Sequence, residues 1–230
     1  MTFDANSLPQ VDHLSVGILG GTGDQGRGLA YRFARAGQRV IIGSRSPERG
    51  VSAAAEIAGM PGVTGEVTGG GNAEASAASD VVIVAVPWEG HAELVGSLRH
   101  SLAGKIVVDC VNPLGFDAKG PYAVRVPEGS AAEQTESLLP ESRVCAAFHH
   151  VSAVVLADPT VDRVDLDVLV LGDDREAVGV VAALAGRIDG MRGVYAGRLR
   201  NAGQVEALTA NIIAINRRYK AHAGIRITDV

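Results

Sequence analysis

The sequence predicts a doubly wound α/β fold built on a parallel sheet, and three observations lead to this prediction. Short, continuous apolar runs such as 16–19 and 105–110 are typical of strands that helices cover on both faces. Segments with helical patterns alternate with these runs, as expected of a parallel sheet with crossover helices. A glycine-rich stretch, Gly20–Gly26, separates the first strand from the first helix. Together these features predict a Rossmann-type sheet.

The expected elements follow one another regularly along residues 16–148. Strands are predicted at residues 16–19, 39–43, 63–67, 80–86, 105–110 and 143–148. Helices are predicted at residues 25–36, 47–58, 73–78 and 130–139. Residues 112–127 contain several prolines and glycines and are expected to form an irregular loop. The predicted sheet therefore has about six strands.

A different pattern begins at residue 149. We expect a smaller C-terminal α/β domain over 149–230, after an NADP-binding domain over 1–148. An apolar run at 166–171 predicts a strand, and Asp173-Asp174 caps a helix that ends near Arg187. The last long helix carries an apolar stripe that must be buried against the first domain or a second subunit, so it favours a homodimer. The stripe consists of Val205, Leu208, Ile212 and Ile215.

Composition and charge narrow the class of protein. The 230 residues are 47% hydrophobic and 20% charged, which is close to the average for folded domains. The net charge of -5 disfavours nucleic acid or an anionic membrane as a partner, because either requires a basic surface. No apolar run approaches membrane-spanning length and the first 13 residues are polar, so we expect a cytoplasmic protein. Cys110 and Cys145 lack metal-ligand spacing and are expected to be buried.

The glycine-rich stretch predicts a dinucleotide site. Gly21 is expected to permit the tight turn, Gly23 to let the backbone approach a pyrophosphate, and Gly26 to let the next helix lie close to the strand. Unpaired amides at the start of that helix, together with the helix dipole, favour an anion. The alternative is a glycine-rich loop that binds no nucleotide. The strand before it and the helix after it favour the dinucleotide site.

The end of the second predicted strand indicates which dinucleotide binds. An NAD site usually has an acidic residue here, which accepts hydrogen bonds from the ribose and repels a 2′-phosphate. This chain instead has Ser44, Arg45, Ser46 and Arg49. Hydroxyl and guanidinium groups donate hydrogen bonds to phosphate oxygens, so the pattern predicts NADP(H).

Chemistry is expected at the carboxyl edge of the sheet, where the chain leaves the later strands. The segments at this edge are 86–91, 112–114 and 147–152. Trp88 either flanks a ring system or serves in packing. At least one of His149 and His150 is expected to line the site.

The scarcity of lysine bears on the type of reaction. A reductase that must also deliver a proton needs a proton donor such as a lysine. This chain has only Lys105, Lys119 and Lys220, and none lies well within the predicted C-terminal helices. Hydride transfer alone removes this need, because the protein then only has to hold two rings face to face. We therefore expect a second redox cofactor.

Several segments, some of them outside the generic nucleotide turn, match one known family. They are Leu19–Gly28, Gly43–Arg45, Val86–Glu89, Ser130–Glu133, Ala147–Ala153, Leu171–Asp174, Ile188–Gly190, Ala196–Gly197, Val205–Glu206 and Leu208–Thr209. In these segments the chain resembles the F-420-dependent NADP oxidoreductase family. The resemblance spans nearly the whole chain. It implies hydride transfer between NADPH and the deazaflavin coenzyme F-420, written F420 below.

The resemblance also implies where NADP(H) binds. The residues that it places at the phosphates are Thr22, Gly23, Asp24 and Gln25 for the pyrophosphate and Ser44, Arg45 and Arg49 for the 2′-phosphate. The residues that it places elsewhere along NADP(H) are Val86, His91 and Ala153.

For the second cofactor the match is weaker. The resemblance places His149 and Val151 beside the nicotinamide, as the residues at the reacting atoms, and the tail near Ala223 against the deazaflavin. The chain departs from the family at Ala207, where a serine is expected, and at 217–223, where a glycine-rich ending is expected. Two other functions therefore stay open: an NADPH-dependent reductase of another acceptor, such as a flavin or a metal chelate, and a non-catalytic NADP sensor.

Overall fold

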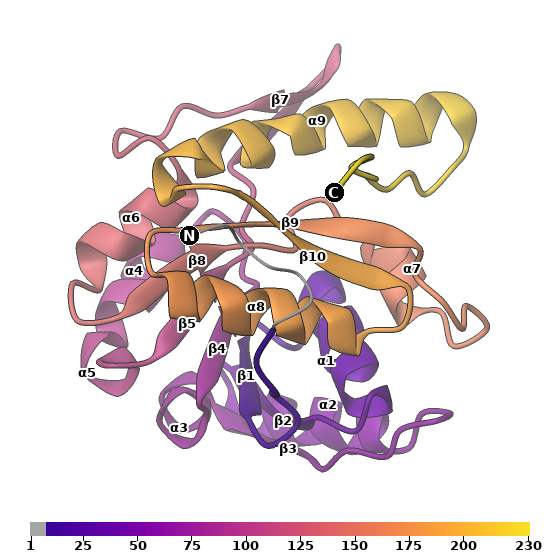
Figure 1. The fold of residues 1–230 in the computed structure, drawn as a ribbon. Coiled ribbons are helices and arrows are strands. Elements are labelled where there is room, and N and C mark those ends of the chain that lie inside the picture. The colour runs from indigo at the N-terminus through magenta and orange to yellow at the C-terminus, as the bar shows by residue number, and fades with distance from the viewer. Residues whose placement is uncertain (1–7) are drawn as a thin grey trace.

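A single mixed sheet forms the centre of the computed structural model, which describes residues 8–230 (Figure 1). Its strands are β1 (Ser15–Leu19), β2 (Arg39–Ser44), β3 (Val67–Gly71), β4 (Val81–Val84), β5 (Ile106–Asp109), β8 (Arg143–Ala146), β9 (Leu166–Gly172) and β10 (Met191–Gly197). Within the described residues the strands lie in the order β10-β9-β8-β5-β4-β1-β2-β3. The strands from β3 to β8 in this order are all parallel, which confirms the predicted Rossmann-type sheet.

The C-terminal part of the chain continues this sheet. Strand β9 pairs antiparallel with β8, and β10 pairs parallel with β9. Only the last residues of β8 and β9 pair, so most of β9 extends beyond the carboxyl edge of the parallel strands. The division of the chain into domains at residues 148 and 149 stays a prediction.

Helices cover both faces of the sheet. They are α1 (Asp24–Arg35), α2 (Pro47–Ala58), α3 (Asn72–Ala78), α4 (His91–Ser97), α5 (Arg99–Leu102), α6 (Ala131–Leu138), α7 (Ala153–Ala157), α8 (Arg175–Arg187), the 3₁₀ turn η2 (Leu199–Asn201) and α9 (Ala202–Tyr219). Helices α1, α2, α7 and α8 pack in one hydrophobic core, and α3, α4, α5, α6 and α9 pack in a second. The protein thus has three layers, with the sheet in the middle.

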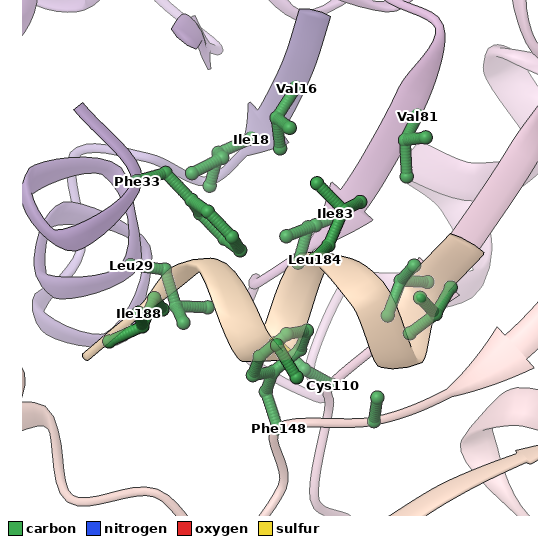
Figure 2. Close-up of a cluster of buried hydrophobic side chains, with 14 of the residues drawn as sticks. Val16, Ile18, Leu29, Phe33, Val81, Ile83, Cys110, Phe148, Leu184 and Ile188 are labelled. Atoms are coloured by element: carbon green, nitrogen blue, oxygen red, sulfur yellow. The ribbon is translucent and has the colours of Figure 1, made fainter. Parts of the chain in front are cut away.

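The first core joins the glycine-turn helix to the end of β8 (Figure 2). Ile18 of β1 and Ile83 of β4 lie in this cluster together with Phe33 of α1. The rings of Phe33 and Phe148 meet edge to face, with centroids 6.0 Å apart and planes at 83°. Such a pair contributes about 1 kcal/mol beyond its buried area. Phe148 is therefore anchored just before the predicted site residues.

Two predicted elements differ from the structure. The strand predicted at 63–67 is wrong in position, because β3 begins at Val67 and 63–66 has no regular secondary structure. Three of the five residues of β3 are glycines, and a Cβ on Gly50 of α2 would meet the main chain of Gly70. This close packing of α2 on bare backbone leaves no apolar pattern to detect.

The loop predicted at 112–127 contains a hairpin of strands β6 (Leu114–Asp117) and β7 (Gly120–Ala123). Its turn is closed by Asp117, which accepts a hydrogen bond of 2.7 Å from the amide of Lys119, and by Gly120 at φ 117°. The hairpin contacts α9 at one end of the molecule (Figure 1).

The apolar stripe of α9 is only half buried within this chain. Val205 faces the second core. Val205 and Ile212 are each 7% exposed, whereas Leu208 and Ile215 are 38% and 44% exposed. Two of the four residues of the stripe are therefore buried within this chain, and burial of the other two against a second subunit stays a prediction.

One buried guanidinium ties α7 to α1. Arg32 of α1 is 3% exposed and donates hydrogen bonds of 2.6 to 2.9 Å to four main-chain carbonyls in α7 and the loop after it. Burial lowers the pKa of Arg32, but a guanidinium stays charged. Hydrogen bonds from a charged donor are stronger than neutral ones, so α7 has a fixed position relative to the glycine turn.

The C-terminal tail packs along the part of β9 that extends beyond β8. The amide of Asp167 donates to the carbonyl of Ile225, and the Asp167 carboxylate accepts hydrogen bonds from Arg192, Arg226 and the amide of Ile227. The hydrogen bond from Arg192 lowers the pKa of Asp167 most, to about 2. The tail therefore satisfies an otherwise open edge of the sheet.

Both cysteines are buried, as predicted. The thiol of Cys110 donates to the carbonyl of Val84, and burial raises the pKa of Cys110 strongly. Burial raises the pKa of Cys145 to about 12. None of the helices within residues 8–230 has both the length and the apolar character needed to cross a bilayer.

Candidate active site at the carboxyl edge of the sheet

The turn between β1 and α1 depends on three closely packed glycines. Gly20, rather than Gly21, has the left-handed backbone, with φ at 73°. A Cβ on Gly21 would lie 2.7 Å from Ile42, and a Cβ on Gly26 would lie 2.7 Å from the carbonyl oxygen of Gly20. The close approach expected for Gly26 is thus confirmed. The turn itself is made possible by Gly20, because residues with a side chain disfavour this φ.

Gly23 differs from the other glycines of the turn. It is exposed, and the nearest atom to a Cβ placed on it would be 3.4 Å away. Gly23 is the N-cap of α1 and has no side chain to satisfy the first amides, which belong to Asp24, Gln25 and Gly26. The surface around Gly23 is therefore open, and the helix start offers free donors to an anion. Thr22 is half-buried beside them.

The end of β2 provides the second part of the site. Ser44 is buried, and its hydroxyl oxygen accepts a hydrogen bond of 3.3 Å from the amide of Ser46, which leaves the hydroxyl proton free to donate. Arg45 and Arg49 are both exposed, and neither guanidinium has an ion-pair partner within the described part of the chain. Ser46 instead caps α2 and bonds Glu48. Three of the predicted 2′-phosphate ligands thus lie within one short segment with unused donors.

A tight turn after β8 lies at the same edge of the sheet. Phe148 has φ at 65°, a conformation that is rare and strained for a bulky residue. Three hydrogen bonds from three elements hold this turn. Gln25 of α1 donates to the carbonyl of Phe148 at 3.2 Å, and Asn112 donates to the carbonyl of His149 at 2.9 Å. The ring of His150 accepts from the amide of Leu169 at 3.4 Å.

Gln25 has a role in addition to the predicted one. Its side-chain amide nitrogen donates to the turn after β8, while its main-chain amide, at the uncapped start of α1, is available to a pyrophosphate. Its side-chain amide connects the glycine turn directly to the residues predicted to border the nicotinamide.

His149 and His150 are both buried, each 3% exposed. Neither ring nitrogen of His149 makes a hydrogen bond of good geometry within residues 8–230. Burial lowers the pKa of His149 to about 4, although the nearby Asp109 carboxylate opposes this shift. Burial also lowers the pKa of His150 to about 4. His149 is thus a neutral imidazole at the sheet edge with both ring nitrogens unused.

His91 lies deeper than predicted. Its ring is fully buried, with Nε2 2.8 Å from the Asp109 carboxylate and Nδ1 2.9 Å from the amide oxygen of Gln134. The hydroxyl of Thr135 also donates to Asp109. Despite burial, the hydrogen bond and charge of Asp109 raise the pKa of His91. Because both ring nitrogens are used, the side chain of His91 has no free group for NADP(H).

The remaining predicted residues lie around this edge. Val86, after β4, contacts the glycine turn, since a Cβ on Gly20 would lie 2.7 Å from its methyl group. Val151 is 4% exposed and its amide closes the turn after β8. Ala153 is the first residue of α7. Ala223 and Ser152 line one small pocket together with residues 163–166, so the structure brings the tail to the residue that follows Val151.

The sequence did not identify several residues that build the site. Asn112 contacts both His149 and Thr209 of α9, while Asp109 and Glu206 are buried carboxylates. Asp109 ends an apolar strand, which is a usable signal for a residue at the carboxyl edge of a sheet. Glu206 interrupts the apolar pattern of α9, but its partners are distant in the chain.

Together, the parallel sheet, its glycine turn and its two free guanidinium groups place this protein among the nicotinamide-dependent oxidoreductases. Residues 15–113 match the family model described as NADP oxidoreductase, coenzyme F420-dependent. An F420-dependent NADP reductase of Methanothermobacter thermautotrophicus is 42% identical over 226 residues, covering 94% of this chain and 96% of the relative. The chain belongs to the F420-dependent NADP oxidoreductase family.

Two further relatives agree with this assignment. An F420-dependent NADP reductase of Methanocaldococcus jannaschii is 41% identical over 94% of this chain and 99% of the relative. The crystal structure of a putative F420-dependent NADP reductase from Arthrobacter sp. FB24 has a TM-score of 0.77 and 28% identity. It covers 94% of this chain and 99% of that one. The likeness therefore extends beyond the nucleotide-binding segment to the C-terminal elements.

The neutral state of His149 predicts how stability depends on pH. An unfolded histidine binds a proton near its ordinary pKa of about 6.5, whereas folded His149 does so only at about 4. Unfolding between these values takes up a proton, so the free energy of unfolding falls as the pH is lowered through this range. We expect His149→Gln to reduce that fall by about 3 kcal/mol in urea titrations. The exposed His100 provides the control: His100→Gln should retain the wild-type pH profile. Equal profiles for the wild type and His149→Gln would contradict the assignment.

Proposed function

We propose that this protein transfers hydride between NADPH and the deazaflavin coenzyme F420. The observation that carries the proposal is a pair of neighbouring groups of hydrogen-bond donors at the carboxyl edge of the sheet, one after β1 and one after β2. Free amides begin α1, and Arg45 and Arg49, which have no ion-pair partner among residues 8–230, follow β2. The turn at 148–151, which hydrogen bonds from Gln25 and Asn112 hold in place, lies at the same edge. The activity named for the relatives above requires this combination of a phosphate-rich cofactor and a rigid surface for its reacting ring.

The residues present fit NADP(H). The amides of 24–26 would hold the pyrophosphate, and Ser44, Arg45 and Arg49 would hold the 2′-phosphate. When bound, NADPH supplies the hydride that F420 accepts. The part of the protein is to place the two rings in contact and to exclude water. Val86 and Val151 contribute apolar surface at this edge, and His149 contributes a neutral ring.

The positions of the three lysines support a reaction in which no lysine donates a proton. Lys105 donates to the carbonyls of Ala77 and Ser79, away from the carboxyl edge. Lys119 lies in the turn of the exposed hairpin, and Lys220 caps the end of α9. None of the three lies at the turn after β8.

The direct test is spectroscopic. We expect the visible absorbance of oxidised F420 to disappear with multiple turnovers when protein and NADPH are added. Free flavin in place of F420 tests the alternative acceptor. Turnover of flavin alone would replace the proposed acceptor, and binding of NADPH with no turnover of either would indicate a sensor.

Arg45 tests the choice of dinucleotide. We expect Arg45→Ala to weaken NADPH binding by about 10- to 100-fold, because a charged hydrogen bond to phosphate contributes about 1.5–3 kcal/mol. NADH binding should change little. Arg39→Ala is the matched control, since Arg39 begins the same strand and is paired with Glu66. Equal losses for the two nucleotides in calorimetric titrations would contradict the 2′-phosphate site.

A homodimer through the outer face of α9 forms part of the proposal. The exposed Leu208 and Ile215 continue the stripe whose other half is buried, and the adjoining hairpin exposes Phe116 and Tyr122. Contiguous apolar surface of this kind is typical of an interface. We expect a dimer in analytical ultracentrifugation and a monomer for Ile215→Glu. A monomeric wild type would contradict this expectation. The cytoplasmic location expected from the sequence stays a prediction.

A further inference from the structure

Two carboxylates and one imidazole are buried together beneath the proposed site. Asp109 and His91 are fully buried, and Glu206 is 3% exposed. Both ring nitrogens of His91 face oxygen acceptors, on Asp109 and Gln134, which is the arrangement of a doubly protonated ring. The positive charge of His91 therefore balances Asp109. No cation remains within the described residues to balance Glu206 when it ionises.

Glu206 connects two helices that are distant in sequence. Its carboxylate oxygens accept hydrogen bonds of 3.0 and 3.2 Å from the amides of Ala131 and Ala132, the first residues of α6. Ser130 caps the next amide, that of Glu133. The start of α9 thus lies against the start of α6 (Figure 1). Glu206 supplies caps that α6 lacks in its own sequence.

The same face of α9 contacts the proposed site. Thr209, one turn after Glu206, donates a hydrogen bond of 3.2 Å to the side-chain oxygen of Asn112. The amide nitrogen of Asn112 donates to the carbonyl of His149. The position of α9 is therefore transmitted through two hydrogen bonds to the turn after β8. The other contacts of α9 with the second core are apolar, through Ala202 and Val205.

We propose that Glu206 is a positioning residue whose protonation controls how firmly α9 is held against α6, and thereby the affinity of the site for F420. This proposal rests on the proposed function. In the protonated form, Glu206 adds no charge to the buried cluster. In the ionised form, it adds an unbalanced negative charge beside Asp109, and α9 is held less firmly. The affinity for NADP(H) should change little, because the groups proposed to hold its phosphates lie at the start of α1 and after β2, and not at the turn after β8.

The surroundings of Glu206 indicate the pH range over which its carboxyl group loses its proton. It faces His91 from α4, Asp109 from β5 and the main-chain amides from α6. Burial, and then the charge of Asp109, raise the pKa of Glu206 to about 7, although the α6 amides oppose the shift. The folded protein thus binds a proton that the unfolded chain releases near its ordinary pKa of about 4.3. Stability from this group is full at acidic pH and is lost as the pH rises through about 7.

The experiment compares the wild type with Glu206→Gln, which keeps the shape and one acceptor but does not ionise. Glu136→Gln is the matched control, because Glu136 lies on the exposed side of α6. Hydrogen-exchange protection of α9 is measured without cofactors from about pH 6 to about pH 8.5, a range that spans the transition. The KM for F420 and the Kd for NADPH are measured over the same range.

In the wild type and in Glu136→Gln, we expect the protection of α9 to fall and the KM for F420 to rise about tenfold above neutral pH, with an unchanged Kd for NADPH. In Glu206→Gln, protection and KM should stay constant. The same pH course in all three proteins would overturn the proposal, and so would a wild type without any change.

Two further measurements decide the proposal if the variant does not fold or if the protein does not reduce F420. If Glu206→Gln does not fold, the carboxyl carbon of Glu206 can be followed by NMR in the wild type. Titration near the ordinary glutamate pKa would overturn the proposal, and titration together with the loss of α9 protection would support it. If NADPH does not reduce F420 at all, the proposed function fails, whereas the exchange measurement still decides whether Glu206 holds α9.

Discussion

The hydrogen bond from Gln25 to the carbonyl of Phe148 joins the two halves of the proposed site. Gln25 lies in the first turn of the helix whose amides are proposed to bind a pyrophosphate, and Phe148 begins the turn that carries His149 and Val151. The left-handed conformation of Phe148 costs about 1–3 kcal/mol. Packing against Phe33 and the hydrogen bond from Gln25 offset this cost. The glycine turn and the proposed nicotinamide surface are therefore positioned as one unit.

Much of the fold could be predicted because its main signals are local. Continuous β-branched runs identify strands that are buried on both faces, and the glycine spacing identifies the nucleotide turn. Strand β3 could not be located, because its glycines pack as bare backbone under α2. The assignment of the tight turn to Gly21 rather than Gly20 was wrong for a related reason. Spacing identifies the motif, whereas the sign of φ depends on contacts such as that between Gly20 and Val86.

In the candidate site, too, features that are local in the sequence could be predicted, and contacts between distant residues could not. Ser44, Arg45 and Arg49 lie within six residues and were predicted together from their chemistry. His91 was placed at the cofactor, but its ring is bound by Asp109 and Gln134, which lie 18 and 43 residues away. Pairings at such separations depend on the order of the strands, which a single sequence does not state. The roles of Asn112 and Glu206 were missed for the same reason.

The burial of the two thiols has a practical consequence for a redox protein. Cys110 is held by a hydrogen bond to β4 and Cys145 lies within β8, and burial keeps both thiols protonated at neutral pH. A protonated, inaccessible sulfur neither reacts with alkylating reagents nor forms disulfides readily. Incorporation of a maleimide dye therefore reports global opening of the sheet, undisturbed by turnover at the carboxyl edge. The rate at which the two thiols are labelled thus measures how fast the protein opens.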